Sequence, residues 1–374
     1  MSNAEVDPLE TVCAAGASRG AGVELIEPRD VPLGGLRAMR VRRTLPQRRR
    51  SFVGAWCFLD HYGPELVEHS GGMNVAAHPH TGLQTVSWLF EGEIEHRDSA
   101  GFHAMVRPGE MNLMTAGHGI SHSERSTPET TTLHGVQLWV ALPESARHGA
   151  KTFEHYEPSP IEGEGWRAWV FLGSLLGETS PVTMFTPLVG AEIVLEPGAS
   201  ITIAVHSEFE HGVLVDAGEV TVATITADRP SRTGLSTDET LSHEPVAHAH
   251  LGYVAPGATQ LVVSAAAGGG PARVILIGGE PFAEEIVMWW NFIGRDHDEI
   301  AQARADWQDQ IEATGVGDPS DPLGESGRGL TPEPGRYGLP NDEPEPPLPA
   351  PKLPIARLVP RKQPGERAGE RPGE

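Results

Sequence analysis

The sequence has little cysteine and no long run of apolar residues. Its 374 residues include only two cysteines, Cys13 and Cys57, which excludes a disulfide framework and indicates a reducing compartment. Cys57 is expected to be a small buried residue. No apolar stretch is long enough to span a bilayer, and the N-terminus lacks the basic flank and apolar core of a secretory signal. These absences predict a soluble cytoplasmic protein that does not act on membranes.

Positive charge is also scarce. The chain has 28 Lys and Arg against 51 Asp and Glu, a net charge of −23, which argues against a general affinity for nucleic acid or anionic lipid. Residues 37–50, RAMRVRRTLPQRRR, are a local exception. They could form a phosphate or nucleic-acid patch, or a strand with outward arginines followed by a charged turn. The acidic remainder of the chain favours the second interpretation.

Glycine and proline, by contrast, are abundant, at 44 and 33 residues. They separate short apolar or alternating runs that are typical of β-strands. Short strands at regular spacing predict an all-β barrel or sandwich. The runs expected to form strands are 23–26, 38–41, 51–60, 85–90, 111–115, 133–142, 166–172, 183–188, 191–195, 200–205, 212–216, 219–226, 251–255, 260–265 and 273–278.

The length of the chain suits two domains. Strand patterns of similar style lie on both sides of a polar, turn-rich stretch at residues 143–165, which indicates two related β units. The expected organisation is a flexible arm (1–22), a metal-binding barrel (23–150), a second barrel without metal (151–295), a helix (296–315) and a Pro-rich, partly disordered extension (316–374).

One segment near the C-terminus predicts a helix. Residues 297–312, HDEIAQARADWQDQIE, place Ile300, Ala303, Trp307 and Ile311 on one face, and Asp296 or Asp298 could cap the start. Trp289 and Trp290 are expected to pack where this helix meets a barrel. In the Pro-rich extension, four apolar residues predict contact with the folded body: Leu348, Leu353, Ile355 and Leu358.

The stretch from His78 to Glu124 carries the chemistry. It opens with His78-Pro79-His80 and closes with His122-Ser123-Glu124, and residues two apart on a strand point to the same face. Three imidazoles and a carboxylate inside a barrel would form a metal site without thiolates, unlike a structural zinc site. Such a donor set suits Fe(II), Mn, Ni, Cu or Zn, and open positions beside it are the pattern of non-haem iron oxygenases.

Other polar residues have less defined roles. Asp60, His61, Gln84 and Asn112 are candidates to hydrogen-bond the ligating imidazoles. His118 could reach the metal, although a place on the rim of its hairpin is favoured. His248-Ala249-His250 repeats the HxH spacing in the second half, but no HxE pair follows it, so that barrel is expected to hold no metal.

These motifs resemble the pirin family of the cupin superfamily. The resemblance rests on His78-Pro79-His80-Thr81-Gly82, Thr115–Ile120 leading into His122-x-Glu124, Phe58–Pro64, and Gly278-Gly279-Glu280-Pro281. It implies two cupin (jelly-roll-like) β-barrels packed face to face, with a metal, usually iron, in the first. The implied ligands are His78, His80, His122 and Glu124. Gln84 departs from the general cupin motif, which has a glutamate after HxH, and His118 stands where the family often has arginine.

The resemblance also implies a function. The leading hypothesis is an Fe(II)-dependent dioxygenase like quercetin 2,3-dioxygenase, which would act with O2 on a flavonol or related aromatic enol. Glu124 would be both a ligand and the acceptor of the substrate's hydroxyl proton. The alternative is a non-catalytic regulator that senses metal or redox state and binds a partner protein. A third hypothesis is a sugar or small-molecule isomerase, which rests only on the wide range of functions found among cupins and on no residue of this chain.

Overall fold

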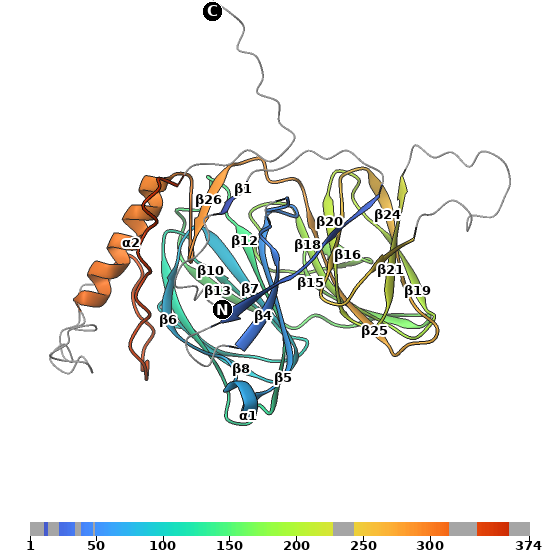
Figure 1. Ribbon diagram of the computed structural model, residues 1–374, viewed down its shortest axis with the longest axis horizontal. Coiled ribbons are helices and arrows are strands. Elements are labelled where there is room, and N and C mark those ends of the chain that lie inside the picture. The colour runs from blue at the N-terminus through green and yellow to red at the C-terminus, as the bar shows by residue number, and fades with distance from the viewer. Residues whose placement is uncertain are drawn as a thin grey trace, which may run out of the picture.

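The computed structural model describes residues 11–13, 22–33, 39–47, 49–226, 243–313 and 335–358. The chain folds mainly into β-strands arranged as two barrels, and a C-terminal helix lies on the first barrel, on the side away from the second (Figure 1). This architecture confirms the expected all-β fold with two cupin barrels. Within the described part of the chain, no helix has the length and apolar character needed to cross a membrane.

The first barrel combines a larger and a smaller sheet. The larger sheet has the order β13 (Thr152–Tyr156), β10 (Met111–Thr115), β7 (Leu83–Glu91), β12 (Thr132–Ala141), β5 (Trp56–Leu66), β4 (Met39–Leu45) and β3 (Arg29–Leu33). The smaller sheet has the order β6 (Asn74–His80), β11 (Ile120–Ser126), β8 (Ile94–Asp98) and β9 (His103–Val106). A short helix, α1 (Val67–Ser70), follows β5.

The second barrel repeats this plan. Its larger sheet has the order β14 (Ile161–Gly163), β15 (Trp166–Leu172), β18 (Leu188–Leu195), β25 (Ala272–Gly279), β20 (Glu210–Ala217), β23 (Leu251–Val254) and β2 (Val23–Ile26). The smaller sheet has the order β19 (Ser200–Ala204), β24 (Ala258–Ala265), β21 (Val220–Thr226) and β22 (Glu244–Val246). The remaining strands are β16 (Ser174–Leu175) with β17 (Glu178–Thr179), and β1 (Thr11–Cys13) with β26 (Ile286–Trp289) and β27 (Phe292–Gly294).

Two strands lie in a different barrel from their neighbours in sequence. β2 pairs with β23 of the second barrel, with Val23 opposite Val254, although the chain then builds the first barrel. β13 pairs with β10 of the first barrel, with Met111 opposite Tyr156, although it follows residue 150. The barrels are therefore joined by hydrogen-bonded strands as well as by side-chain packing.

The larger sheets of the two barrels pack against each other through a shared apolar core. The core includes, from both barrels, Trp88, Val136, Phe171, Leu214, Ile275 and Ile277. Gly54 lies where the backbones of the two barrels are close together: its φ is +58°, and a Cβ there would lie 2.7 Å from Gly279 Cα. Only glycine fits this position without displacing one barrel from the other.

The C-terminal helix α2 (His297–Glu312) matches the expected range. Its start is capped by the side chain of Asp296, which accepts a hydrogen bond from the backbone N–H of Glu299 at 3.0 Å. The predicted apolar face is buried and packs with Trp289 and Trp290. The expected packing of the two tryptophans at the junction of helix and barrel is confirmed.

Residues 335–358 of the Pro-rich extension lie on α2 and on the outer face of the smaller sheet of the first barrel. Trp307 Nε1 donates to the carbonyl of Leu348 at 2.8 Å, and Leu348 N–H donates to Ala77 on β6 at 2.8 Å. Leu353 and Leu358 join the apolar cluster around the helix. Contact with the body is confirmed for these three leucines and wrong for Ile355, which is fully exposed.

Two further predictions from the sequence are wrong. No strand forms at 183–187, because the side chain of Glu154 occupies the N–H of Thr183 and proline follows at 187. The arginines of residues 37–50 do not all point outward, since Arg43 and Arg50 are buried. Arg43 donates to both oxygens of Asp60 at 2.6 and 2.8 Å, and this bidentate pairing makes the burial of its charge tolerable.

Candidate metal centre

The two histidine motifs lie side by side on neighbouring strands. β6 carries His78 and His80, and β11 carries His122 and Glu124. The strands pair antiparallel with His122 opposite His78. The register shifts between His122 and Glu124, and such bulges are used beside functional sites to redirect a side chain.

Three imidazoles converge inside the first barrel. One ring nitrogen each from His78, His80 and His122 lies within 4.8 Å of the others, and all three residues are buried. His80 Nε2 and His122 Nε2 are 3.0 Å apart. His78 Nδ1 donates to the carbonyl of Ala76 at 2.9 Å, which leaves its Nε2 buried without a hydrogen-bond partner.

Glu124 forms a second group with His122 and with His96, a residue that the sequence did not single out. The ligand atoms of these three buried residues also lie within 4.8 Å of one another. His96 comes from β8, opposite Glu124 in the register. His122 therefore belongs to both groups and links Glu124 to the three imidazoles.

His96 fixes the orientation of His122. His122 Nδ1 and His96 Nδ1 are 3.4 Å apart, and His96 Nε2 lies 3.2 Å from Asp98 Oδ2. If His96 donates to Asp98, its Nδ1 can accept the N–H of His122 and leave His122 Nε2 with its lone pair toward His80. The available sequence signal was the HxD pair His96-Arg97-Asp98 on β8, but the sequence does not show which residues of β11 this pair lies opposite.

Burial keeps these imidazoles neutral. It lowers the pKa of His78 to about 3 and holds the pKa of His80 and of His122 well below the ordinary value. A neutral imidazole with a free lone pair is the form that binds metal, so no proton has to leave before coordination. The converging nitrogens, the buried carboxylate of Glu124 and the partnerless His78 Nε2 fit a divalent transition metal.

The residues expected to support the ligands have other partners. Asp60 pairs with Arg43, and Gln84 donates to Thr115 at 3.0 Å. Asn112 Oδ1 accepts from His155 at 2.7 Å. The ligands contact other groups, among them the Ala76 carbonyl, His96 and Ser87, whose Oγ lies 3.4 Å from Glu124 Oε1.

His118 lies in the exposed turn before β11. Its ring is 6.0 Å from that of His148, and its carbonyl accepts a hydrogen bond from Arg336 at 2.8 Å. Burial and the charge of Arg336 lower the pKa of this histidine. This position is the hairpin rim that the sequence favoured over a place beside the metal.

The corresponding strands of the second barrel carry apolar residues. β19 and β24 occupy the places that β6 and β11 have in the first barrel, and Ile201 and Ile203 point inward from β19. They face Val263 and Leu261 of β24. These positions offer no metal ligand.

His61 contributes to a polar contact between the barrels, not to the candidate metal site. Its Nε2 donates to Asp216 Oδ1 at 2.7 Å, and His134 Nε2 donates to the same oxygen at 2.5 Å. Arg273 contacts Asp216 Oδ2 at 3.2 Å. Burial lowers the pKa of His61 to about 4, so its contact with Asp216 is a hydrogen bond at neutral pH and not an ion pair.

Comparisons with known proteins agree with this geometry. A family model described as "Pirin" matches residues 37–140, and one described as "Pirin C-terminal cupin domain" matches residues 190–311. A Pseudomonas aeruginosa protein named "Putative quercetin 2,3-dioxygenase PA1205" is 38% identical over 77% of this chain and 84% of its own. A Caulobacter vibrioides pirin-like protein is 35% identical over 72% of this chain and 88% of its own.

Among solved structures, quercetin 2,3-dioxygenase from Acinetobacter baumannii superimposes with a TM-score of 0.74 at 32% identity. The alignment covers 90% of this chain and 98% of that one. The similarity therefore extends over both barrels and is not limited to the His78–Glu124 stretch.

Proposed function

The chain belongs to the pirin family, and from this membership and the buried histidines and glutamate we propose that it is an Fe(II)-dependent dioxygenase like quercetin 2,3-dioxygenase. The substrate would be a flavonol or related aromatic enol, together with O2. The observation that carries the proposal is the convergence of three buried imidazole nitrogens within 4.8 Å, with Glu124 linked to them through His122. Mn, Ni, Cu and Zn remain chemically compatible with the same donors.

His78, His80, His122 and Glu124 would hold the metal. Bound iron would supply a positive charge that lowers the pKa of a substrate hydroxyl and a centre at which O2 and substrate can exchange electrons. The protein would supply the rest: His96 and the Ala76 carbonyl fix the rings of His122 and His78. Fixed rings keep the ligand geometry intact while substrate enters and product leaves.

Glu124 would also accept the substrate's hydroxyl proton. Its side chain is fully buried, and Ser87 Oγ lies 3.4 Å from Glu124 Oε1 and 3.2 Å from Gln137 Oε1, so its one proton can be donated to either oxygen. A proton moved to a carboxylate oxygen of Glu124 would stay inside the barrel, away from bulk water. General-base assistance of this kind contributes about 10²- to 10⁴-fold to a rate.

Aromatic side chains form one wall beside the ligands. Trp139 meets the ring of His80 edge to face at 5.2 Å and stacks on Phe58 at 4.0 Å. Trp139 and Phe58 are buried and belong to the apolar core shared by the two barrels. These rings make the surroundings of the ligands apolar and aromatic, which favours a neutral ring system over a sugar.

The test is oxygen uptake. Protein loaded with Fe(II) under anaerobic conditions is mixed with quercetin and air, and we expect turnover above that of free iron. The variant His80→Ala should lose both metal and turnover, and Glu124→Ala should lose at least about 100-fold in kcat/KM. The matched control is His118→Ala, which removes an exposed histidine and should change neither. Wild-type protein that holds one iron per chain but turns over no faster than free iron would refute the proposal.

A metal-sensing regulator that binds a partner protein is the second candidate. The side chains of all four proposed ligands are fully buried, which suits a site that holds metal more than one that admits a bulky flavonol. This candidate predicts iron binding without turnover, and a partner protein whose capture depends on the metal. Metal-dependent capture that is lost in His80→Ala and kept in His118→Ala would support it.

A further inference from the structure

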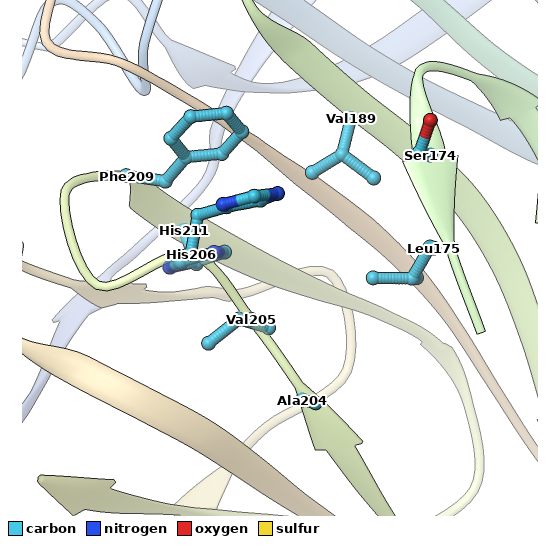
Figure 2. Close-up of a pocket in the computed structure, with 8 residues that line it drawn as sticks. All are labelled: Ser174, Leu175, Val189, Ala204, Val205, His206, Phe209 and His211. Carbon is cyan, nitrogen blue, oxygen red and sulfur yellow. The ribbon is translucent and has the colours of Figure 1, made fainter. Parts of the chain in front are cut away.

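The second barrel has a pocket of its own, and none of the residues that line it is a candidate metal ligand. It has a volume of about 200 Å³ and lies between the end of β19, the start of β20 and the hairpin of β16. Figure 2 shows Phe209 and His211 on one side and Ser174 and Leu175 on the other, with Val189 between them. The exposed residue Ala204 lies along the edge, so the pocket opens to the surface.

His211 is the buried polar residue of this pocket, whereas the other two polar lining residues, Ser174 and His206, are exposed. Side chains alternate along β20, so that Leu214 packs against the first barrel while Val213 and Val215 fill the interior of the second. His211 shares the inward direction of Val213 and Val215, and it is 1% exposed. Both of its ring nitrogens are buried without a hydrogen-bond partner. Buried polar atoms usually have a hydrogen-bond partner, so we expect a ligand or a water molecule to hydrogen-bond to these two nitrogens.

The charge of the pocket favours a neutral occupant. Burial, with a smaller contribution from His206, lowers the pKa of His211 to about 4, so the ring is neutral at physiological pH. A neutral imidazole offers one N–H donor and one acceptor nitrogen. The lining residues include no lysine, arginine, aspartate or glutamate. A charged ligand would lose its hydration here with no opposite charge to compensate.

The size of the pocket favours a single ring. A cavity of about 150 Å³ lined by apolar side chains is enough to hold benzene, and pockets for drug-sized molecules begin at about 300 Å³. The volume of about 200 Å³ lies between these values. Phe209 offers an aromatic face, while Leu175 and Val189 offer aliphatic contacts.

We propose that this pocket binds a small, neutral, single-ring phenol, whose hydroxyl hydrogen-bonds to His211 and whose ring packs between Phe209 and Val189. The hydroxyl can donate to the acceptor nitrogen of His211 or accept from its N–H, as a hydrocarbon cannot. The site is separate from the candidate metal centre, and the proposal does not rest on the dioxygenase function.

The test is calorimetric titration of the full-length protein with phenol, after chelator treatment so that phenol cannot bind a metal. We expect one saturable site per chain, weaker binding of benzene and no binding of benzoate. His211→Phe keeps a ring but removes the nitrogens, and it should weaken phenol binding about tenfold while leaving benzene binding unchanged. Ala204→Trp should fill the mouth and abolish both, and His243→Ala, an exposed histidine of the same barrel outside the pocket, should change neither.

Three outcomes would overturn the proposal. They are no saturable binding of phenol to wild-type protein, equal binding of phenol and benzoate, or phenol binding that survives Ala204→Trp. Circular dichroism and the thermal midpoint of each variant establish that it is folded. If His211→Phe fails to fold, Ala204→Trp and the benzoate comparison still decide the question.

Discussion

Asp216 joins the two barrels, and its removal should destabilise the whole protein. Its side chain is fully buried and accepts from His61 at 2.7 Å and from His134 at 2.5 Å. Arg273 contacts its second oxygen at 3.2 Å. The two histidines belong to the first barrel, whereas Asp216 and Arg273 belong to the second. The substitution Asp216→Asn preserves the shape of the side chain and removes the charge.

The expected cost follows from these contacts. A hydrogen bond to a charged group contributes about 1.5–3 kcal/mol, and breaking a buried charged contact costs about 3–5 kcal/mol. Asparagine keeps one oxygen that accepts from the two imidazoles, but its amide N–H₂ then faces the guanidinium of Arg273. Both of these groups are donors, so the contact with Arg273 is lost. We therefore expect the free energy of unfolding to fall by about 3 kcal/mol, a large part of the roughly 5–15 kcal/mol typical of a folded protein.

The assay is urea unfolding at pH 7.5 in the presence of a chelator, followed by circular dichroism and tryptophan fluorescence. Removing metal keeps its binding energy out of the comparison. The matched control is Glu219→Gln, which neutralises an exposed carboxylate three residues away and should change stability by less than about 0.5 kcal/mol. A loss below about 1 kcal/mol for Asp216→Asn would show that the contact does not stabilise the junction of the barrels.

Two further predictions concern histidines. Burial, offset in part by Asp216, lowers the pKa of His61 to about 4, below its unfolded value of about 6.5. The unfolded chain alone therefore takes up this proton as pH falls from about 6.5 to 4, and about 3 kcal/mol of stability should be lost in that window. Urea midpoints across these pH values should fall less steeply in His61→Gln, and an unchanged slope would contradict the assignment. Separately, His96→Ala should weaken metal binding about 10- to 100-fold, because His122 loses the partner that orients its ring. Competition with a chromophoric chelator measures the metal affinity of the variant. An affinity equal to that of His118→Ala would contradict the orienting role of His96.

Local patterns were enough to predict much of the fold. Helix α2 was readable because the spacing of Ile300, Ala303, Trp307 and Ile311 repeats with the helical period, and Asp296 supplies the expected cap. The HxH and HxE pairs were readable because alternation on a strand needs no knowledge of the partner strand. Cys57 is buried as expected.

Features that depend on long-range pairing were not readable. His96 joins His122 and Glu124 only because β8 pairs with β11 in one register. His61 was considered as support for the metal ligands, but its partner Asp216 lies 155 residues away in the other barrel. The burial of Arg43 likewise depends on Asp60, which a charge count of residues 37–50 cannot anticipate.

The position of β2 has a consequence for the order of events during synthesis. Residues Val23–Ile26 leave the ribosome early, but their partner strand, Leu251–Val254, is made much later. At a translation rate of about 5–20 residues per second, β2 waits roughly 10–45 seconds for that partner. The first barrel can assemble in this interval while β2 remains an open edge, available to chaperones or to wrong partners. When the second barrel is completed, β23 pairs with β2 near the N-terminus. A ribosome that stalls before residue 251 therefore releases a first barrel in which β2 has no partner strand.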